Sequence, residues 1–318
     1  MAALYITEDD VRSIMDMEKS LLIIHKVFKE LASGRAINEP RQRVRAPGIM
    51  LHTMSAANEY LKYVGWKSYT TTKTGAQFHV AIYDQETGEM RALIEGDFLG
   101  QLRTGAASGV ATEYMARPDS KVVGLFGAGL QARTQLQAVC LTRKIEFVSV
   151  YSRDFEKCSR FAEEMTELCD VEVKASHSPD ETAAEKDIVI CATTSKAPLF
   201  DGRVLDEGTH MNVVGSNHRS RREIDRTTIK RADVIVCDDI EQCKLEAGDF
   251  IQPVDEGITD WRLMHNLCEI VAERQTGRAT EDQVTLFKSV GLAVEDVAMG
   301  VKVYELALEE GLGVDLPF

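Results

Sequence analysis

Five basic side chains stand in segments where they can bind a carboxylate. Arg41, Arg43 and Arg45 alternate along an expected strand, so their side chains project from one face. Lys67 follows an apolar β segment, and Arg103 begins a stretch rich in small residues. Each cation by itself fits a solvated ion pair, because Lys and Arg are mostly exposed in proteins. One arginine of the strand together with Lys67 and Arg103 forms a fork that suits a substrate carboxylate.

A glycine-rich segment follows the apolar sequence from residue 122 to residue 126 and leads into a helix-forming stretch. This order of strand, glycine loop and helix is that of a dinucleotide fingerprint. Gly127 permits the tight turn, Gly129 lets the backbone approach a pyrophosphate, and the helix amides that follow hold its charge. A structural turn that binds nothing is the alternative. The expected cofactor contacts in this segment are Gly127, Ala128, Gly129, Leu130 and Gln131.

The next expected strand ends where an NAD-binding protein usually has an acidic residue for the ribose hydroxyls. Ser152 and Arg153 stand there instead, and Asp154 comes slightly too late. Because a hydroxyl and a guanidinium suit a 2′-phosphate, we favour NADP as the cofactor and keep NAD as the alternative. Thr193 and Thr194 end another expected strand at the same edge, where small polar residues either face a cofactor or make a plain turn.

The composition is that of an ordinary globular protein of 318 residues, with 44% hydrophobic and 28% charged residues. A net charge of −14 argues against binding to nucleic acid or to an anionic membrane, because both require clustered Lys and Arg. The seven cysteines are scattered and show neither a disulfide framework nor the spacing of a zinc site, so no metal is expected. With no apolar segment long enough for a leader or a membrane span, the sequence indicates a cytoplasmic protein.

The order of the expected elements divides the chain into three parts. Apolar residues recur with helical spacing from Thr7 to Leu31, and Thr7 with Asp10 resembles a capping box. Short β-rich pieces between residues 41 and 93, with turn residues at 84–88, predict an antiparallel sheet. Five apolar strands then alternate with helices, which is typical of a parallel α/β sheet. A last helix over roughly residues 291–310 is expected to pack on the amino-terminal region.

The predicted fold class is therefore α/β, with a Rossmann dinucleotide-binding domain and an α+β substrate domain. Residues 1–113, completed by the carboxyl-terminal helix at 297–318, are assigned to the substrate domain. Residues 114–296 are assigned to the Rossmann domain. Two domains are expected at this length, because single hydrophobic cores stop growing at about 250 to 300 residues.

The sequence resembles the ornithine cyclodeaminase/mu-crystallin family over nearly its whole length. This family also contains alanine dehydrogenases and reductases of ketimines and pyrroline carboxylates. The matching segments come in the same order along the chain and leave little room for coincidence. They are GWKSY around Lys67, LGQLRTGAASGVA at Leu99–Ala111, GAGLQA at Gly127–Ala132, VVGSN at Val213–Asn217 and VTLFKSVGLAVEDVA at Val284–Ala298.

The resemblance implies roles for several residues of these segments. Arg41, Lys67 and Arg103 would hold the substrate carboxylate, and Lys67 would also take part in proton transfer. Thr104 would lie near the cofactor phosphates. The resemblance further implies a homodimer built through the substrate domain. The glycine turn adds three expected cofactor contacts, which are Val214, Gly215 and Ser216.

Two positions depart from the cyclodeaminases of the family and favour a different activity. Asn217 stands where they carry a catalytic aspartate, and an amide cannot act as the general base that deprotonates an amine. His52 stands where they carry a glutamate. Reduction of an imine needs fewer proton transfers, because Lys67 or a water held by Asn217 or His218 is enough to keep the imine protonated. His52 and His79 are further candidates for delivering this proton.

The sequence therefore predicts an NAD(P)H-dependent reductase of an imino acid or cyclic ketimine that also runs as an amino acid dehydrogenase. One alternative is a lyase like ornithine cyclodeaminase, which recycles bound NAD without net redox change. Another is a non-catalytic ligand-binding protein like mu-crystallin. Whether the substrate is a pyrroline, a piperideine or an open-chain imine stays open at this level.

Overall fold

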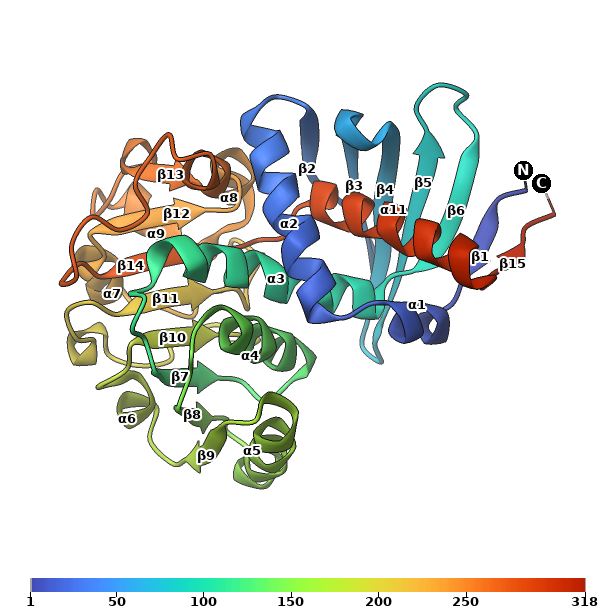
Figure 1. Cartoon of the computed structure of the whole chain (residues 1–318). Helices are drawn as coiled ribbons and strands as arrows, with labels where there is room; N and C mark the ends of the chain where they lie inside the picture. Colours follow the sequence, from blue (N-terminus) through green and yellow to red (C-terminus); the bar gives the residue numbers. More distant parts are fainter. Residues whose placement is uncertain (1, 318) are drawn as a thin grey trace. The chain divides into compact units, whose positions relative to one another are not determined.

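A computed structural model describes residues 2–317 of the chain. The chain forms two compact units. In Figure 1, unit 1 is drawn in blue to cyan and in red, and unit 2 in green to orange. Unit 1 contains the residues up to Arg103 together with those from Gly291 onward, and unit 2 contains Thr104–Val290. The domain boundaries expected from the sequence, after residue 113 and before residue 297, fall inside helices α3 (Asp97–Met115) and α11 (Ala293–Glu310) and stay a prediction.

Unit 1 is built on a seven-stranded sheet in the order β15-β1-β6-β5-β4-β3-β2. Strands β2 to β6 are successive antiparallel neighbours, as the β-rich pieces of the sequence predicted. The first and last strands of the chain lie side by side, because β1 pairs with β6 on one edge and with β15 on the other (Figure 1). The strands are β1 (Leu4–Ile6), β2 (Ala36–Ala46), β3 (Ile49–Asn58), β4 (Tyr63–Thr72), β5 (Ala76–Asp84), β6 (Met90–Glu95) and β15 (Val314–Asp315).

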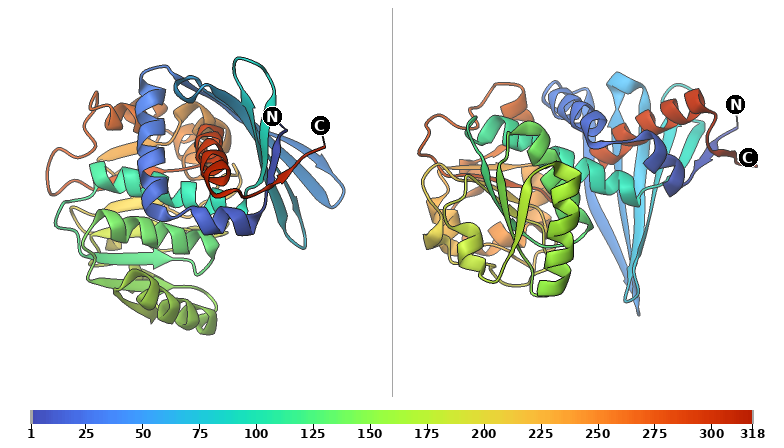
Figure 2. Two further views of the ribbon diagram at one scale, coloured as in Figure 1. Left: turned by 45° about the vertical axis from the view of Figure 1, so that its right-hand side comes forward. Right: turned by 60° about the horizontal axis from the view of Figure 1, so that its bottom comes forward.

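Helices cover one face of this sheet, which we call the inner face. The helix α11 crosses it in contact with β2 to β6, as predicted, and two amino-terminal helices pack against α11 (Figure 2). The predicted capping box is confirmed, because the Thr7 side chain accepts from the Asp10 backbone N–H and the Asp10 carboxylate accepts from the Thr7 N–H. The amino-terminal helices are α1 (Glu8–Ile14) and α2 (Met17–Ala32).

Unit 2 is built on an eight-stranded parallel sheet in the order β13-β12-β14-β11-β10-β7-β8-β9. The five predicted strands are all present, as β7, β8, β10, β11 and β12, and three more were not predicted. Because the strands are parallel, their carboxyl ends meet at one edge, where such sheets bind ligands. The strands are β7 (Val122–Phe126), β8 (Phe147–Tyr151), β9 (Glu172–Ser176), β10 (Ile188–Cys191), β11 (His210–Val213), β12 (Val234–Cys237), β13 (Met264–Asn266) and β14 (Thr285–Lys288).

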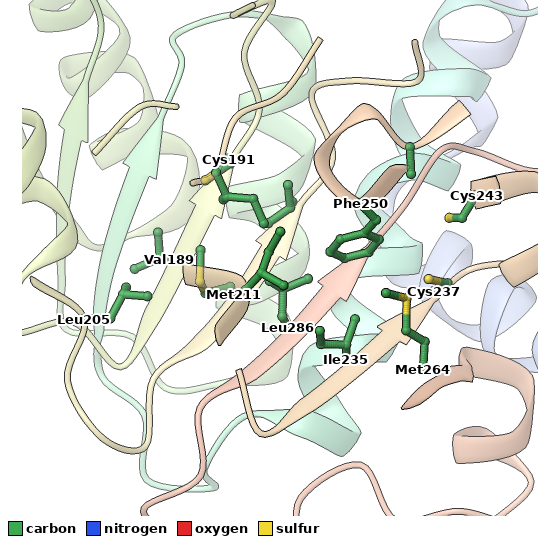
Figure 3. Packing of buried hydrophobic residues seen from close by; sticks show 14 of the residues in the cluster. Val189, Cys191, Leu205, Met211, Ile235, Cys237, Cys243, Phe250, Met264 and Leu286 are labelled. Carbon is green, nitrogen blue, oxygen red and sulfur yellow. The ribbon is translucent and has the colours of Figure 1, made fainter. Parts of the chain in front are cut away.

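Apolar cores lie on both faces of the parallel sheet, as expected when helices cover both sides. Alternate residues of β10 show this: Ile188 and Ile190 belong to the core under α4 and α5, whereas Val189 and Cys191 belong to the core on the other face. Figure 3 shows this second core, in which the ring of Phe250 packs among side chains of the central strands. The helices are α4 (Leu130–Thr142), α5 (Phe155–Cys169), α6 (Pro179–Ala183), α7 (Arg226–Arg231), α8 (Ile240–Glu246), α9 (Gly248–Asp255) and α10 (Leu267–Val271).

Candidate active site

Lys67 is a buried lysine on the inner face of the sheet in unit 1. It lies on β4 between Met54 of β3 and Val80 of β5, and its exposed fraction is 2%. Its neighbours in sequence, Trp66 and Ser68, point to the opposite face, because side chains alternate along a strand. A buried ammonium needs a counter-charge, so the residues around Lys67 decide what it can do.

Arg41 reaches the same inner face through an irregularity of β2. The register with β3 shifts between Glu39 and Gln42, next to Pro40, which has no backbone N–H to donate. The extra residue reverses the in-and-out alternation of side chains along β2. Asn38 before the shift and Arg41 after it therefore lie on the same face, and both contact the segment at the start of α11. Arg41 Nη2 donates to the Gly291 carbonyl at 3.2 Å, and the Asn38 side chain accepts from the Val294 N–H at 3.3 Å. Of the three arginines predicted to share this face, only Arg41 is buried, while Arg43 is half-buried and Arg45 is exposed.

Two carboxylates in the first turn of α11 hold the other cations. Asp296 Oδ1 accepts from Lys67 Nζ at 2.6 Å and from Arg103 Nε at 3.1 Å. Glu295 Oε2 accepts from Arg103 Nη1 at 3.1 Å. The amino-terminal turn of a helix favours negative charge, and both carboxylates are fully buried. Neither acid was assigned a role from the sequence, although both lie within one of the matching segments.

We call Arg41, Lys67, Arg103, Glu295 and Asp296 the cation cluster. Three positive groups and two negative groups leave one positive charge in excess when all are ionised. Burial, with Arg103 and Arg41 nearby, lowers the pKa of Lys67 to about 8, against the opposing effect of Asp296. The lysine of the cluster can therefore give up a proton near neutral pH.

Two glycines leave room for the cationic groups of this cluster. A Cβ atom at Gly100 would lie 2.7 Å from Lys67 Nζ, and one at Gly291 would lie 2.5 Å from Arg103 Nη1. Gly291 also has a φ of +81°, which side chains other than glycine rarely adopt. Larger residues at either position would displace the cations.

A row of rings lies beside the cation cluster on the inner face. The His52 ring stacks on Tyr69 with centroids 4.1 Å apart, and Tyr69 stacks on Phe78 at 5.0 Å. Lys67 Nζ lies 5.4 Å from the Phe78 centroid, within range of a cation–π contact. His52 Nε2 is 3.2 Å from the Thr71 hydroxyl. The structure thus brings His52 onto the face that carries Lys67, where an apolar ring surface adjoins the cations.

His79 does not join this group. It pairs with Ser68 across β4 and β5, so it points to the face opposite Lys67. Its charge acts on Glu95, whose pKa the Tyr5 hydroxyl, the Glu8 backbone N–H and His79 lower. His79 is therefore not placed to donate a proton beside Lys67.

The fingerprint loop of unit 2 has the geometry that a dinucleotide requires. Gly127 has a φ of +111°, and a Cβ atom there would lie 2.4 Å from the Ala192 carbonyl oxygen. Gly129 precedes α4 as its N-cap, and no atom lies within 4 Å of the position of a Cβ. The first amides of α4 have no partner within the helix and donate no hydrogen bond to a side chain of the N-cap. The residues present therefore fit a pyrophosphate at this helix start.

The remaining predicted cofactor residues lie on loops at the same edge of this sheet. Val214 N–H donates to the Cys191 carbonyl at 2.9 Å, and Ala192 N–H donates to the Phe126 carbonyl at 2.9 Å, so the loops after β7, β10 and β11 are joined. Contact with a cofactor stays a prediction for each residue. The residues that this edge brings together are Gly127, Ala128, Gly129, Leu130, Gln131, Ser152, Arg153, Thr193, Thr194, Val214, Gly215 and Ser216.

Asp154 has a structural role at the end of β8. Its side chain caps α5 by accepting from the Lys157 N–H at 3.0 Å. Arg153 beside it is exposed, and Ser152 is half-buried. The acidic residue closest to the expected ribose position is thus used by the helix, which leaves Ser152 and Arg153 as the side chains at this strand end.

Thr104 and Asn217 also belong to unit 2. Thr104 is buried in α3, and its carbonyl accepts from Gln135 Nε2 of α4 at 2.9 Å. Asn217 is half-buried in the loop after β11, next to His218, whose Nδ1 accepts from the Ser220 N–H at 3.2 Å. Their predicted roles stay predictions.

Two kinds of feature are absent from the part of the chain that the structure describes. Among residues 2–317, no group of three or more His, Cys, Asp or Glu side chains is placed to hold a metal ion. No helix in the same range has both the length and the hydropathy to cross a membrane.

Comparison with known proteins identifies relatives over the whole chain. The profile of the ornithine cyclodeaminase/mu-crystallin family matches residues 2–311. A Delta(1)-pyrroline-2-carboxylate reductase of Bacillus cereus is 32% identical over 325 residues, which cover 99% of this chain and 100% of that protein. These matches confirm the resemblance inferred from the sequence.

Solved structures show the same architecture. The reductase of that name from Thermococcus litoralis, in complex with NADH and L-proline, has a TM-score of 0.95 and 37% identity, covering 98% of this chain and 100% of that chain. An archaeal alanine dehydrogenase dimer with bound NAD has a TM-score of 0.95 and 28% identity, with 100% of both chains covered. The predicted α/β fold class with a Rossmann domain and a second domain is confirmed.

Proposed function

The chain belongs to the ornithine cyclodeaminase/mu-crystallin family, and on that basis we propose that it is an NAD(P)H-dependent reductase of an imino acid or cyclic ketimine. The reaction converts a C=N bond next to a carboxylate into an amine, and its reverse is amino acid dehydrogenation. The observation that carries this proposal is the cation cluster, in which Arg41, Lys67 and Arg103 all contact the segment at the start of α11. A small acid with one carboxylate, such as pyrroline-2-carboxylate, complements the positive charge that this cluster has in excess.

Arg41 and Arg103 bind the substrate carboxylate in this proposal. Each guanidinium is a planar group of donors, and both are fixed by contacts with the segment from Gly291 to Asp296. A fixed fork orients the planar acid, and the rings of Tyr69 and Phe78 provide an apolar surface for its carbon atoms.

Lys67 supplies the proton. With a pKa of about 8 it is protonated near neutral pH, and it can transfer that proton to the imine nitrogen. The bound cofactor supplies the hydride to the imine carbon. The products are the amino acid, the oxidised cofactor and a neutral Lys67, which takes up a proton from solvent before the next turnover.

Asn217 argues for reduction over cyclodeamination. A lyase of this family must remove a proton from an amine, and an amide side chain cannot do so. Imine reduction requires no such base, because the imine accepts a proton. His52 also fits this proposal, since its ring is occupied in a stack with Tyr69 and in a contact with Thr71.

The choice of NADPH over NADH is part of the proposal. Ser152 and Arg153 stand at the end of β8, and Asp154, the only carboxylate of this strand end, caps α5 instead. A hydroxyl and a guanidinium bind a 2′-phosphate, whereas a free carboxylate there would repel it. Two relatives have structures with NADH or NAD bound, so NADH must be tested beside NADPH.

A second copy of the chain is proposed to cover the outer face of the sheet in unit 1. Large apolar side chains on β2, β3 and β4 point away from α11 and are 37% to 67% exposed. Such a patch marks an interaction surface, and an archaeal relative forms a dimer. Light scattering of the protein and of a Leu51→Glu/Val64→Glu variant tests this: a dimer that the variant turns into a monomer is expected. The side chains are Ile37, Val44, Ile49, Leu51 and Val64.

The decisive experiment follows loss of reduced-cofactor absorbance with purified protein and Δ1-pyrroline-2-carboxylate or Δ1-piperideine-2-carboxylate. NADPH and NADH are tested in parallel. Stoichiometric oxidation of cofactor is expected, and the preferred ring size identifies the substrate. Ammonia release from ornithine without net cofactor oxidation would overturn the reductase in favour of the lyase. Binding of imino acid without turnover would favour a ligand-binding protein.

A further inference from the structure

A buried carboxylate, Glu223, joins two loops at the carboxyl edge of the sheet in unit 2. Glu223 Oε1 accepts from the Thr193 backbone N–H and from the Thr193 hydroxyl, both at 2.7 Å. Its Oε2 accepts from the Gly215 N–H at 2.7 Å. Thr193 and Gly215 follow β10 and β11, and both are predicted cofactor residues. One side chain therefore fixes the backbone on two loops at once.

Two further charged residues stand behind Glu223. Asp249 in α9 accepts from the Glu223 backbone N–H at 2.6 Å, and its other oxygen lies 2.8 Å from Lys288 Nζ. Lys288, at the end of β14, donates to the Ser216 carbonyl at 2.8 Å. All three side chains are buried, with exposed fractions of 0% to 1%. We call Glu223, Asp249 and Lys288 the carboxylate junction.

The carboxylate junction leaves no space for a side chain at Gly215. A Cβ atom at Gly215 would lie 2.2 Å from the Thr193 carbonyl oxygen and 2.4 Å from Glu223 Oε1. The two loops approach each other so closely that only glycine fits. Any shift of the Glu223 carboxylate therefore moves the backbone of both loops.

The chemistry of the junction indicates a role beyond holding the fold together. Two acids and a lysine in the interior carry a desolvation penalty, and well-packed apolar residues often stabilise such a position equally well. Backbone N–H groups at a cofactor site, however, need acceptors that fix their direction. A carboxylate provides two oxygens in one plane, and here both are used.

We propose that Glu223 is a positioning residue for the cofactor: it holds the loops at Thr193 and at Gly215 in the arrangement that receives the dinucleotide, and its ionisation controls cofactor affinity. This inference rests on the proposed function, because it requires a dinucleotide at this edge of the sheet. Asp249 and Lys288 act through Glu223 by fixing its backbone and the Ser216 carbonyl.

The charged and titratable groups that face Glu223 are Asp249, Lys288 and the Cys191 thiol. Burial and the charge of Asp249 raise the pKa of Glu223 to about 7, while Lys288 and the hydrogen bonds from Thr193 act in the opposite direction. An ionised carboxylate accepts stronger hydrogen bonds than a neutral acid does. Lowering the pH through this range therefore weakens the hydrogen bonds from Thr193 and Gly215 to Glu223.

The test measures the Kd of NADH for the full-length protein by cofactor fluorescence, over roughly one pH unit on either side of that pKa. NADH is used instead of NADPH, because a 2′-phosphate titrates near pH 6 by itself. We expect the wild-type affinity to fall as the pH falls, by up to about tenfold per unit. The E223Q variant is expected to bind about tenfold more weakly at high pH and to lose the pH dependence, because its amide NH2 faces a backbone N–H.

A matched control separates positioning from stability. Asp187 lies at the amino edge of the same sheet, where its carboxylate accepts from the Lys121 N–H at 2.8 Å and from the Val122 N–H at 2.9 Å. D187N replaces the charged acceptor of two backbone N–H groups with a neutral amide and breaks the ion pair with Arg117, far along the strands from the cofactor edge. It is expected to lower the stability of the protein and to leave the Kd of NADH and its pH dependence unchanged.

Three results would overturn the inference. The first is a wild-type Kd that does not change with pH, which decides the matter even if E223Q fails to fold. The second is wild-type NADH affinity in a folded E223Q protein. The third is an equal loss of affinity in D187N. If the wild-type protein binds neither NADH nor NADPH at any pH, the proposed function fails together with this inference.

Discussion

The two buried ionic clusters of this protein carry opposite charges in excess. The cation cluster of unit 1 has three basic groups and two carboxylates, whereas the carboxylate junction of unit 2 has two carboxylates and one lysine. In the junction, N–H and O–H groups of the neighbouring loops complete the solvation of Glu223. In the cation cluster, the excess positive charge is proposed to complement a substrate acid.

Buried charge is used differently in the two units. A carboxylate whose two oxygens both accept from the backbone fixes a geometry, as Glu223 does at Thr193 and Gly215. In the proposed function, the cation cluster instead binds a ligand of opposite charge. Matched substitutions in the two clusters are therefore expected to affect different ligands, the imino acid in one case and NADH in the other.

The largest effect is expected from Lys67→Met, which removes both the proton donor and one cation. General acid catalysis contributes about 10² to 10⁴ in rate, so kcat/KM for the imino acid is expected to fall by that factor. Steady-state kinetics with a saturating concentration of reduced cofactor measure it. Lys67→Arg, which keeps the charge but gives up its proton far less readily, is expected to recover KM and not kcat. A loss of less than tenfold in Lys67→Met would remove the lysine from the mechanism.

Asp296→Asn and Asp249→Asn form the matched pair. Asp296→Asn removes the carboxylate paired with Lys67, and Asp249→Asn removes the one paired with Lys288. Breaking a buried pair costs about 3 to 5 kcal/mol of stability. Asp296→Asn is expected to raise the KM of the imino acid, because Lys67 and Arg103 lose the acceptor that holds them in place, and to leave the Kd of NADH unchanged. Asp249→Asn is expected to raise the Kd of NADH and to leave the KM of the imino acid unchanged. Chemical denaturation and the two ligand constants are measured together, and identical effects on both ligands would show that the clusters are not specialised.

The pH profile is expected to have one limb from each cluster. As the pH rises above about 8, Lys67 loses its proton, and kcat/KM for the imino acid falls by about tenfold per unit. As the pH falls below about 7, Glu223 is protonated, and kcat/KM for NADH falls. Lys67→Arg is the control, because any basic limb that remains in this variant comes from titration of the substrate imine.

The same shift in Lys67 has a consequence for stability. Its pKa is lowered from 10.5 to about 8 in the folded chain, so between these values the unfolded chain binds more protons. The contribution of Lys67 to the free energy of unfolding therefore rises with pH over that window. Urea denaturation of wild type and Lys67→Met at two pH values within it measures the difference, which a lysine with an unshifted pKa would not show.

The smallest effect is expected at the exposed end of β8. Arg153→Ala should raise the KM of NADPH by up to about tenfold and leave that of NADH unchanged, because only NADPH has a 2′-phosphate. An exposed contact is weaker than the buried contacts of either cluster. Equal changes for both cofactors would show that Arg153 does not read the phosphate.

The residues with local signals could be predicted from the sequence. The loop at Gly127 and Gly129 is recognisable because its glycines stand in order between an apolar strand and a helix. Lys67 and Arg103 could be singled out because each is a basic residue within an apolar or small-residue segment. The antiparallel strands β2 to β6 could be predicted from short β-rich pieces with turn residues between them, and the parallel sheet from apolar strands that alternate with helices.

The carboxylate partners could not be predicted in the same way. Glu295 and Asp296 begin a helix, where acidic residues are common for a reason unrelated to function. Glu223 lies in a polar loop between several arginines, and its burial depends on contacts with residues distant in sequence. The strands β9, β13 and β14 were missed because they are short or mix polar with apolar residues. Burial of a charged residue is a property of the tertiary structure, and no local pattern reports it.

The division of unit 1 into two chain segments has a consequence for synthesis on the ribosome. Lys67 and Asp296 are 229 residues apart, and all of unit 2 lies between the two segments of unit 1. At about 5 to 20 residues per second, the ribosome needs roughly 10 to 45 s to supply the counter-charge after Lys67 has emerged. The nascent sheet must wait for that time with its lysine hydrated and its inner face uncovered by α11. Unit 2 is complete before that helix appears, so the Rossmann unit is the first part of the nascent chain that can fold.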